Sequence, residues 1–393
     1  MSHSLGQSSP HWTKCVVWLA LLLSAASAAA TISFEPPRLD VKDPIPLMAY
    51  YYIWFDKGSW NRAKTDYPQL GRYTSDNEEV IKQHVRWAIE AGIDGFIVSW
   101  KSTSKLDSRL EKLMEVAAAE NFALWIIYQG LDFERNPLPL NRIESDLEYF
   151  STAYADHPAF GMYDKPVVIW SGTWEFSRED VGEVTNTYRD GLYILASERN
   201  EQGYLRLADL VDGNAYYWSS VNPDTYPGYQ EKLSAMGEAV HRRGGIWVAP
   251  AAPGFDARLL GGTTVVERQN GEMLRRQMNA ALRSSPNAIG LISWNEFSEN
   301  SHVEPSVNYG RSALEALAKR QISSGPAIGD FDSSAPGTTD RGSFYGIYVV
   351  GIVVAFVGTC LALLIMRVRR KDTRNFRAQR SPLLGHPSQR KER

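Results

Sequence analysis

Two kinds of hydrophobic pattern alternate along the chain from about residue 47 to residue 321. Short runs that are apolar throughout, and rich in aromatic and β-branched residues, indicate strands that are buried on both faces. Between most of them lie longer stretches in which apolar residues recur with the period of an amphipathic helix. The predicted strands lie at residues 47–54, 93–99, 123–128, 166–170, 191–196, 212–218, 246–249 and 288–294.

Amphipathic helices are expected between these strands, and the pattern is least clear between the fourth strand and the sixth. Eight buried strands that alternate with helices are typical of a (β/α)8 TIM barrel, an α/β fold that forms a single domain. A doubly wound open sheet is the main alternative. That fold usually carries a glycine-rich phosphate loop after its first strand, where residues 50–60 are aromatic instead. The predicted helices lie at residues 77–91, 105–120, 142–154, 229–243, 271–283 and 314–321.

Two further apolar segments lie outside this alternating pattern. Residues 16–30 follow Lys14 and end in alanine and serine, including Ala26-Ser27-Ala28. A basic flank, a short apolar stretch and a small-residue cleavage site predict a secretory signal peptide over residues 1–30, with an uncleaved N-terminal anchor as the alternative. Residues 344–366 carry no charge and are long enough to cross a bilayer as one helix.

The charges beside the second apolar segment predict its orientation. Four basic residues lie within residues 367–371, at the start of the tail 367–393, and basic residues mark the cytosolic side of a membrane span. Residues 322–343 are rich in Gly, Ser, Pro and Thr and predict a flexible linker. We therefore expect a single-pass type I membrane protein of the secretory pathway. Its folded domain, residues 31–321, would be lumenal or extracellular, in the Golgi, in endolysosomes or at the cell surface.

Composition narrows the classes of function. The formal net charge is −3 and no basic cluster occurs outside the tail, which argues against a nucleic-acid partner. The two cysteines, Cys15 and Cys360, lie in the terminal apolar segments, so the domain has no disulfide, thiolate metal site or cysteine nucleophile. The 12 Trp and 19 Tyr residues exceed what a core needs, and aromatic rings are the flat platforms of carbohydrate-binding clefts.

The densest polar segment of the domain, residues 293–305, follows the eighth predicted strand directly. In a TIM barrel the active site gathers at the C-terminal ends of the strands. Glycosidases need two carboxyl groups, and Glu296 and Glu299 would share one face of a helical turn. Two carboxylates so close would push their pKa values apart. We therefore predict Glu296 and Glu299 as a catalytic pair, the alternative being two solvated loop glutamates.

Aromatic and polar residues near several strand ends are the candidates for substrate binding, although some of the rings could simply fill the barrel. A metal site formed by Glu299, His302 and Glu304 is a further alternative, but no other histidine cluster supports it. No metal and no cofactor are therefore expected. The predicted substrate-binding residues are Tyr51, Tyr52, Trp54, Trp100, Tyr216, Tyr217, Trp294, Asn295, His302 and Glu304.

Several ordered motifs resemble those of glycoside hydrolase family 99, the endo-α-1,2-mannosidase family, from about residue 47 to residue 318. Residues 51–55 (YYIWF) are similar to the opening Y-Y-x-W-Y of that family, and residues 67–75 (YPQLGRYTS) to its Y-P-x-L-G-x-Y-S-S segment. Residues 157–160 (HPAF) and 253–255 (PGF) follow in the expected order. Residues 295–299 (NEFSE), followed by Val303-Glu304-Pro305, resemble N-E-W-H-E-G-T-x-I-E.

The resemblance implies a (β/α)8 barrel that hydrolyses an α-linked glycan with retention of configuration and without a metal. It further implies a 1,2-anhydro sugar intermediate, with Glu296 as the base on the substrate 2-hydroxyl and Glu299 as the general acid and then base. The H-I-E-P-Y motif after the third strand is replaced by residues 126–130 (IIYQG). Two alternatives therefore stay open: a catalytically inactive carbohydrate-binding barrel, and a related glycosidase of different sugar specificity.

Overall fold

The computed structural model describes residues 45–323. The predicted signal peptide, membrane helix and cytosolic tail lie outside these residues, as does all of the predicted linker except residues 322 and 323. Those two residues belong to the last helix, which runs further than its hydrophobic pattern predicted. Within residues 45–323, no helix combines the length and the apolar character that a membrane span requires.

Eight parallel strands close into a barrel in which the first strand pairs with the last. Around the barrel each strand pairs with its neighbour in sequence, counting only the barrel strands. The predicted TIM barrel is confirmed, and each of the eight predicted runs overlaps a barrel strand. The strands are β1 (Leu47–Tyr52), β2 (Gly95–Trp100), β3 (Ala123–Gln129), β4 (Val167–Ser171), β5 (Tyr193–Ala196), β6 (Gly213–Ala215), β7 (Ile246–Ala251) and β10 (Ala288–Leu291).

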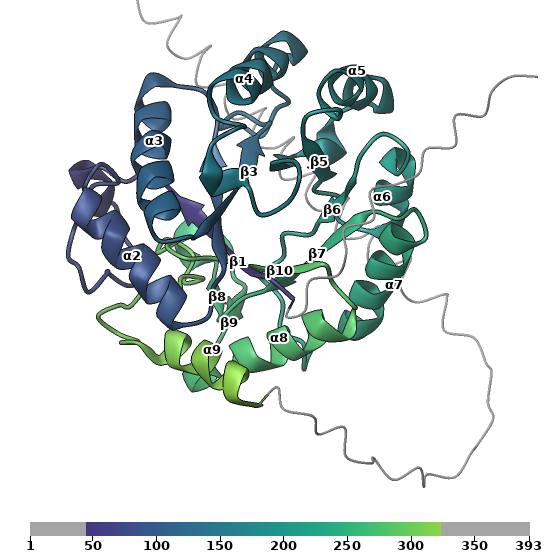
Figure 1. Cartoon of the computed structure of the whole chain (residues 1–393). Helices are drawn as coiled ribbons and strands as arrows, with labels where there is room; N and C mark the ends of the chain where they lie inside the picture. Colours follow the sequence, from purple (N-terminus) through teal and green to yellow (C-terminus); the bar gives the residue numbers. More distant parts are fainter. Residues whose placement is uncertain (1–44, 324–393) are drawn as a thin grey trace, which may run out of the picture. The chain divides into compact units, whose positions relative to one another are not determined.

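Helices surround the strands as an outer ring, in chain order (Figure 1). Two of them lie in the stretch where the hydrophobic pattern was least clear. The helices are α2 (Glu78–Glu90), α3 (Ser104–Ala119), α4 (Leu140–Ala153), α5 (Arg178–Tyr188), α6 (Glu201–Leu207), α7 (Tyr229–His241), α8 (Glu272–Arg283) and α9 (Ser312–Ser323).

Short elements decorate the loops between strands and helices. A two-stranded antiparallel hairpin, which the sequence did not predict, follows β7. It consists of β8 (Phe255–Asp256) and β9 (Val265–Val266), and the 3-10 turns are η1 (Lys57–Asn61), η2 (Pro158–Phe160), η3 (Thr173–Glu175), η4 (Arg258–Leu260) and η5 (Gln269–Gly271).

Capping residues explain where several helices begin. The side chain of Asn77 accepts a hydrogen bond from the backbone N–H of Glu79 at the start of α2, and Thr103 does the same for Leu106 in α3. Ser177 starts α5 with a reciprocal capping box. These side chains accept hydrogen bonds from N–H groups that have no partner inside the helix, and they therefore fix the residue at which each helix begins.

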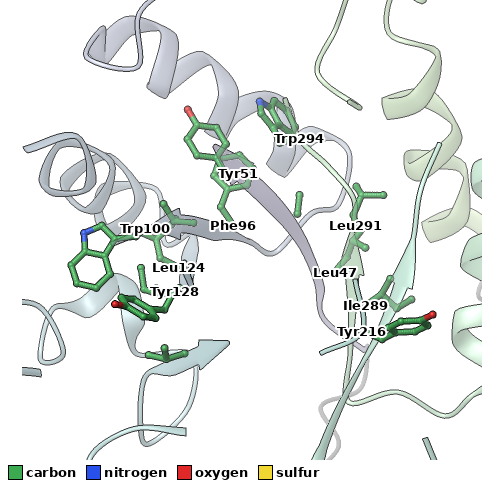
Figure 2. Close-up of a cluster of buried hydrophobic side chains, with 14 of the residues drawn as sticks. Leu47, Tyr51, Phe96, Trp100, Leu124, Tyr128, Tyr216, Ile289, Leu291 and Trp294 are labelled. Atoms are coloured by element: carbon green, nitrogen blue, oxygen red, sulfur yellow. The ribbon is translucent and has the colours of Figure 1, made fainter. Parts of the chain in front are cut away.

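Side chains that point alternately to the two faces of each strand divide the core into two layers. Met48, Tyr50, Ile97, Trp125 and Ile169 belong to a cluster that fills the barrel. The residues between them along the chain belong to a second cluster on the outer face of the strands, and Figure 2 shows Leu47, Tyr51 and Phe96 from this cluster. Both faces of each strand are therefore buried, which is the physical reason why the runs are apolar throughout. The same alternation decides which residues at the strand ends face the barrel mouth.

Phe150 on α4 provides a test of the outer layer. Its ring is fully buried and lies 5.1 Å from the ring of Phe160 and 5.8 Å from that of Trp100. Phe150→Ala is expected to lower the free energy of unfolding by about 3–5 kcal/mol, because it leaves a cavity that rigid neighbours cannot close. Ser145→Ala on the exposed side of α4 is the control and should change it by less than about 0.5 kcal/mol. Denaturant titration measures both, and equal effects would contradict this packing.

Candidate active site

The segment that follows β10 folds back on itself and carries both predicted catalytic residues. The backbone N–H of Ser293 donates to the carbonyl of Ser301 at 2.7 Å, and the N–H of Val303 donates back to Ser293 at 2.9 Å. The N–H of Glu304 donates to Trp294 at 2.8 Å. These bonds tie both ends of the segment to each other at the end of β10. The loop is therefore a closed, rigid support for Glu296 and Glu299.

Neighbouring loops fix this segment from both sides. The hydroxyl of Thr65, in the loop after β1, donates to the carbonyl of Phe297 at 2.7 Å. On the other side, the backbone N–H of Asp256 in β8 donates to the carbonyl of Glu299 at 2.7 Å. The buried guanidinium of Arg268 donates to the carbonyls of Asn300 and His302 at 3.1 and 2.5 Å. Contacts from both neighbours thus position the loop.

Glu296 is a partly exposed carboxylate inside this loop. The backbone N–H of Ser298 donates to its Oε1 at 3.0 Å, and its own N–H donates to the hydroxyl of Ser293 at 2.9 Å. Burial raises the pKa of Glu296, while the Ser298 hydrogen bonds and the ammonium of Lys64 act in the opposite direction. Lys64 and the Ser298 N–H therefore favour the charged form of Glu296.

Glu299 is the more strongly perturbed of the two carboxyl groups. Burial, and then the charge of Glu296, raise the pKa of Glu299 to about 7. The hydroxyl of Ser301 donates to its Oε1 at 3.0 Å, and the hydroxyl of Tyr217 lies 3.5 Å from the same atom. Near neutral pH Glu299 can therefore hold a proton beside a second carboxylate, which is the arrangement that general acid catalysis requires.

Aromatic side chains stand beside this pair at the barrel mouth. The hydroxyls of Tyr52 and Tyr217 are 2.7 Å apart, and the ring of Trp54 stacks on Tyr52 at 4.3 Å. Burial first, and then the two glutamates, raise the pKa of Tyr52 well above its ordinary value, and the pKa of Tyr217 is raised as well. The phenols are therefore hydrogen-bond donors at any physiological pH. Trp54 is 42% exposed and offers a flat apolar ring to solvent.

Asn295 and Glu304 lie beneath the loop rather than at its surface. The buried side chain of Asn295 bonds both the N–H and the carbonyl of Tyr52, at 2.9 and 3.0 Å. Glu304 is also buried, accepts a hydrogen bond from the hydroxyl of Tyr73 at 2.8 Å, and lies 3.0 Å from Nε2 of His84. Both residues, predicted to contact substrate, instead hold the end of β1 and the loop after it against the catalytic segment.

His302 is part of the same support. Its fully buried ring stacks on Phe297 at 4.1 Å, and Nε2 lies 3.5 Å from a carboxylate oxygen of Asp66. Burial lowers the pKa of His302 to about 3, so the ring is neutral. Because Glu299, His302 and Glu304 each have separate partners, they do not form a shared ligand set. Within residues 45–323 no group of three or more His, Cys, Asp or Glu side chains could hold a metal ion.

Four predicted substrate-binding residues face the helices and not the barrel mouth. Figure 2 shows Tyr51, Trp100, Tyr216 and Trp294 in the outer core layer. Trp100 donates from Nε1 to Asp107 on α3 at 2.9 Å, and Tyr51 lies 3.0 Å from Nδ1 of His84 on α2. The sequence prediction placed them at strand ends without assigning their side of the strand. Successive side chains along a strand point to opposite faces, and these four residues belong to the outer buried cluster, so they are core residues.

Sequence reasoning missed two residues that act on the carboxyl pair. Ser301 donates directly to Glu299, and its place two residues further along the same polar segment was a usable signal. Lys64 interacts electrostatically with Glu296 from a distant part of the chain. No local pattern marks Lys64, because only the loop contact between Thr65 and Phe297 brings the two segments together.

The fold and this site define a (β/α)8-barrel protein with a paired-carboxylate site at the strand ends. Solved structures with the same fold include the GH99 endo-α-mannosidase from Bacteroides thetaiotaomicron, with a TM-score of 0.62 at 20% identity. That match covers 70% of this chain and 95% of the other. A glycoside hydrolase-like protein matches with a TM-score of 0.55 at 17% identity, over 72% of this chain and 95% of the other.

The sequence model of glycosyl hydrolase family 99 matches residues 56–325, so the chain belongs to this family. Among curated relatives, the glycoprotein endo-alpha-1,2-mannosidase of Xenopus laevis is 23% identical over 266 residues, 61% of this chain and 58% of that protein. Its counterpart from Rattus norvegicus is 22% identical, over 61% of this chain and 56% of that protein. The chain thus matches less than three fifths of the length of these relatives.

The raised pKa of Glu299 predicts how pH affects stability. The pKa of Glu299 is about 7 in the folded state and near 4.5 in the unfolded state, so the folded state binds the proton more tightly. The contribution of this group to stability is therefore lost as pH rises between these two values. The free energy of unfolding of Glu299→Gln should accordingly rise by about 1–3 kcal/mol relative to that of the wild type between pH 4.5 and pH 8. Thermal unfolding across pH measures this, with the exposed Glu175→Gln as control. A pH-independent difference would contradict the assignment.

Proposed function

We propose that the chain is a retaining glycoside hydrolase that cleaves α-linked glycans in the manner of an endo-α-mannosidase. One observation carries the proposal: Glu299, with a pKa of about 7, lies beside the carboxylate of Glu296 at the open end of the barrel. A proton donor and a base in one site are what hydrolysis of a glycosidic bond requires. The partly exposed positions of both groups leave them accessible to a substrate.

In the proposed first step, Glu296 takes the proton from the 2-hydroxyl of the sugar. The freed 2-oxygen attacks C1 of the same sugar, and the bond from C1 to the leaving oxygen breaks as Glu299 protonates that oxygen. The product is a 1,2-anhydro sugar, and Glu299 is left ionised. Lys64 supports this assignment, because its charge favours the ionised form of Glu296, which must act as the base.

In the proposed second step, Glu299 works in the reverse direction. Its carboxylate takes a proton from water as the water oxygen attacks C1. The bond from C1 to the 2-oxygen breaks, and that oxygen takes back the proton from Glu296. Two inversions at C1 give net retention, and both carboxyl groups return to their starting states. The protonated Tyr52 and Tyr217 are placed to donate hydrogen bonds to the sugar or to Glu299.

The proposed substrate is a glycan that contains α-1,2-linked mannose. The names of the Xenopus and rat relatives supply this linkage. Trp54, stacked on Tyr52 and open to solvent, offers the apolar surface on which a pyranose ring packs. Linear α-linked manno-oligosaccharides are therefore the first substrates to test.

A glycan-binding barrel without catalysis is the second candidate. The observation in its favour is at the end of β3, where Gln129 donates to the hydroxyl of Ser99 at 3.0 Å. The third-strand motif that this segment replaces carries a histidine and a glutamate in the family it resembles. The amide of Gln129 and the hydroxyl of Ser99 are neutral, so they can form hydrogen bonds to a sugar but supply no charge to the reaction.

We further propose that the barrel is held in the secretory pathway as the folded part of a type I membrane protein. The supports are the signal-like residues 1–30 and the apolar residues 344–366 with basic residues after them. Protease protection of an epitope tag on residue 393, in intact microsomes, tests the orientation. Cleavage of that tag from the cytosolic side is expected, and its protection would contradict the proposal.

Loss of either carboxyl group should slow hydrolysis strongly. We expect Glu299→Gln and Glu296→Gln each to lower kcat by about 10²–10⁴-fold, because each removes one proton transfer. The exposed Glu175→Gln should retain wild-type activity. Mass spectrometry of the products detects cleavage, and proton NMR of the first-formed anomer detects retention. Glycan binding by the wild-type protein without cleavage would favour the second candidate.

The pH profile of kcat/KM should fall above about pH 7, because Glu299 loses the proton that it donates. The hydrogen bond from Tyr217 lowers the pKa of Glu299, so Tyr217→Phe should move this basic limb to higher pH. Initial rates between pH 4 and pH 9 measure the limb in both proteins. A basic limb that does not move in Tyr217→Phe would assign the proton donor to another group.

A further inference from the structure

The loop after β3, residues 130–138, presents an isolated aromatic ring to solvent. Phe133 at the tip of this loop is 99% exposed. The loop follows the C-terminal end of a barrel strand, so it lies at the same end of the barrel as Glu296 and Glu299. A phenylalanine ring left fully in water gains nothing from burial in the folded chain. Its position at the mouth points to a ligand.

The base of this loop is fixed by two glycines. A Cβ on Gly130 would lie 2.4 Å from Nε1 of Trp170 and 2.5 Å from the carbonyl oxygen of Ser171. Gly172 has a φ of +91°, and a Cβ there would lie 2.4 Å from Cγ of Leu131. The first residues of the loop are therefore packed directly against the end of β4, where no larger side chain fits.

Hydrogen bonds fix the tip of the loop as well. The carboxylate of Asp132 accepts from the backbone N–H groups of Glu134 and Asn136, both at 2.8 Å. The N–H of Leu138 closes the loop by donating to the carbonyl of Gly130 at 2.9 Å. The backbone that carries Phe133 is therefore fixed, so little backbone conformational entropy is lost when a ligand contacts the ring.

A cationic side chain accompanies the ring. Nζ of Lys101, which follows β2, lies 5.1 Å from the centroid of the Phe133 ring. The ring thus supplies an apolar face, and the ammonium supplies hydrogen-bond donors next to it. A pyranose needs both, because it has an apolar C–H face and a rim of hydroxyl groups.

We propose that Phe133 and Lys101 form a distal sugar subsite, which holds a pyranose residue of the glycan some way from the bond that is cut. The inference rests on the proposed function for its substrate class. Exposed polar residues, Glu134, Arg135 and Asn136, follow the ring directly. A single ring in polar surroundings suits a sugar, whereas a lipid surface or a protein partner would call for a continuous apolar patch.

Binding of manno-oligosaccharides of increasing length tests the subsite. The full chain with Glu299→Gln is titrated with two- to six-residue oligosaccharides by isothermal calorimetry. Adding Phe133→Ala should weaken binding of the longest oligosaccharides by about three- to tenfold, the size of one aromatic contact, and leave the disaccharide unchanged. Phe133→Trp should restore the affinity. Ile89→Ala, which alters a 43% exposed residue at the far end of α2, is the control and should change neither.

The outcomes separate the subsite from the proposed function. Equal losses for short and long oligosaccharides, or no loss in Phe133→Ala, would overturn the subsite even if the wild-type chain cleaves glycans. A loss confined to long oligosaccharides would support it, even if the wild-type chain cleaves none and the hydrolase proposal fails. Phe133-dependent binding to phosphatidylcholine vesicles, with unchanged oligosaccharide affinity, would overturn the subsite in favour of a lipid surface.

Discussion

Closure of the barrel by pairing of the first strand with the last is the constraint on which the site depends. Leu47, Met48 and Ala49 pair with Ile289, Gly290 and Leu291, and the N–H of Trp294 then donates to the carbonyl of Tyr50 at 2.7 Å. Asn295 extends this contact by bonding both backbone groups of Tyr52. Segments almost 250 residues apart in sequence therefore meet at one edge of the mouth. Without closure, neither Tyr52 nor Lys64 would reach the two glutamates.

Burial at this edge determines the chemistry that the two carboxyl groups can perform. Removing them from water disfavours their charged forms, and their mutual repulsion adds to this effect for Glu299. The contacts around them differ. Glu296 accepts a backbone hydrogen bond and faces an ammonium group, whereas Glu299 faces hydroxyl groups. This asymmetry favours Glu296 as the charged partner and Glu299 as the proton carrier, although both lie in one loop.

The hydrophobic pattern predicted the eight barrel strands because strands buried on both faces leave a continuous apolar run. It could not tell which side of a strand each aromatic residue occupies, so Trp100 and Trp294 were assigned to the cleft although they pack against helices. The pattern also missed the hairpin β8–β9, whose strands are two residues each. Glu296 and Glu299 were predictable from a dense local motif. Lys64 was not, because its role depends on a contact between loops far apart in sequence.

The most direct test of the account is the titration of Glu299 itself. Carbon-13 NMR of δ-labelled glutamate, assigned by comparison with Glu299→Gln, follows its carboxyl group without any substrate. We expect a midpoint at about pH 7, and a lower one in Glu296→Gln because the repulsion from Glu296 is removed. A midpoint near 4.5 that does not respond to Glu296→Gln would contradict the account. The site would then lack its proton donor.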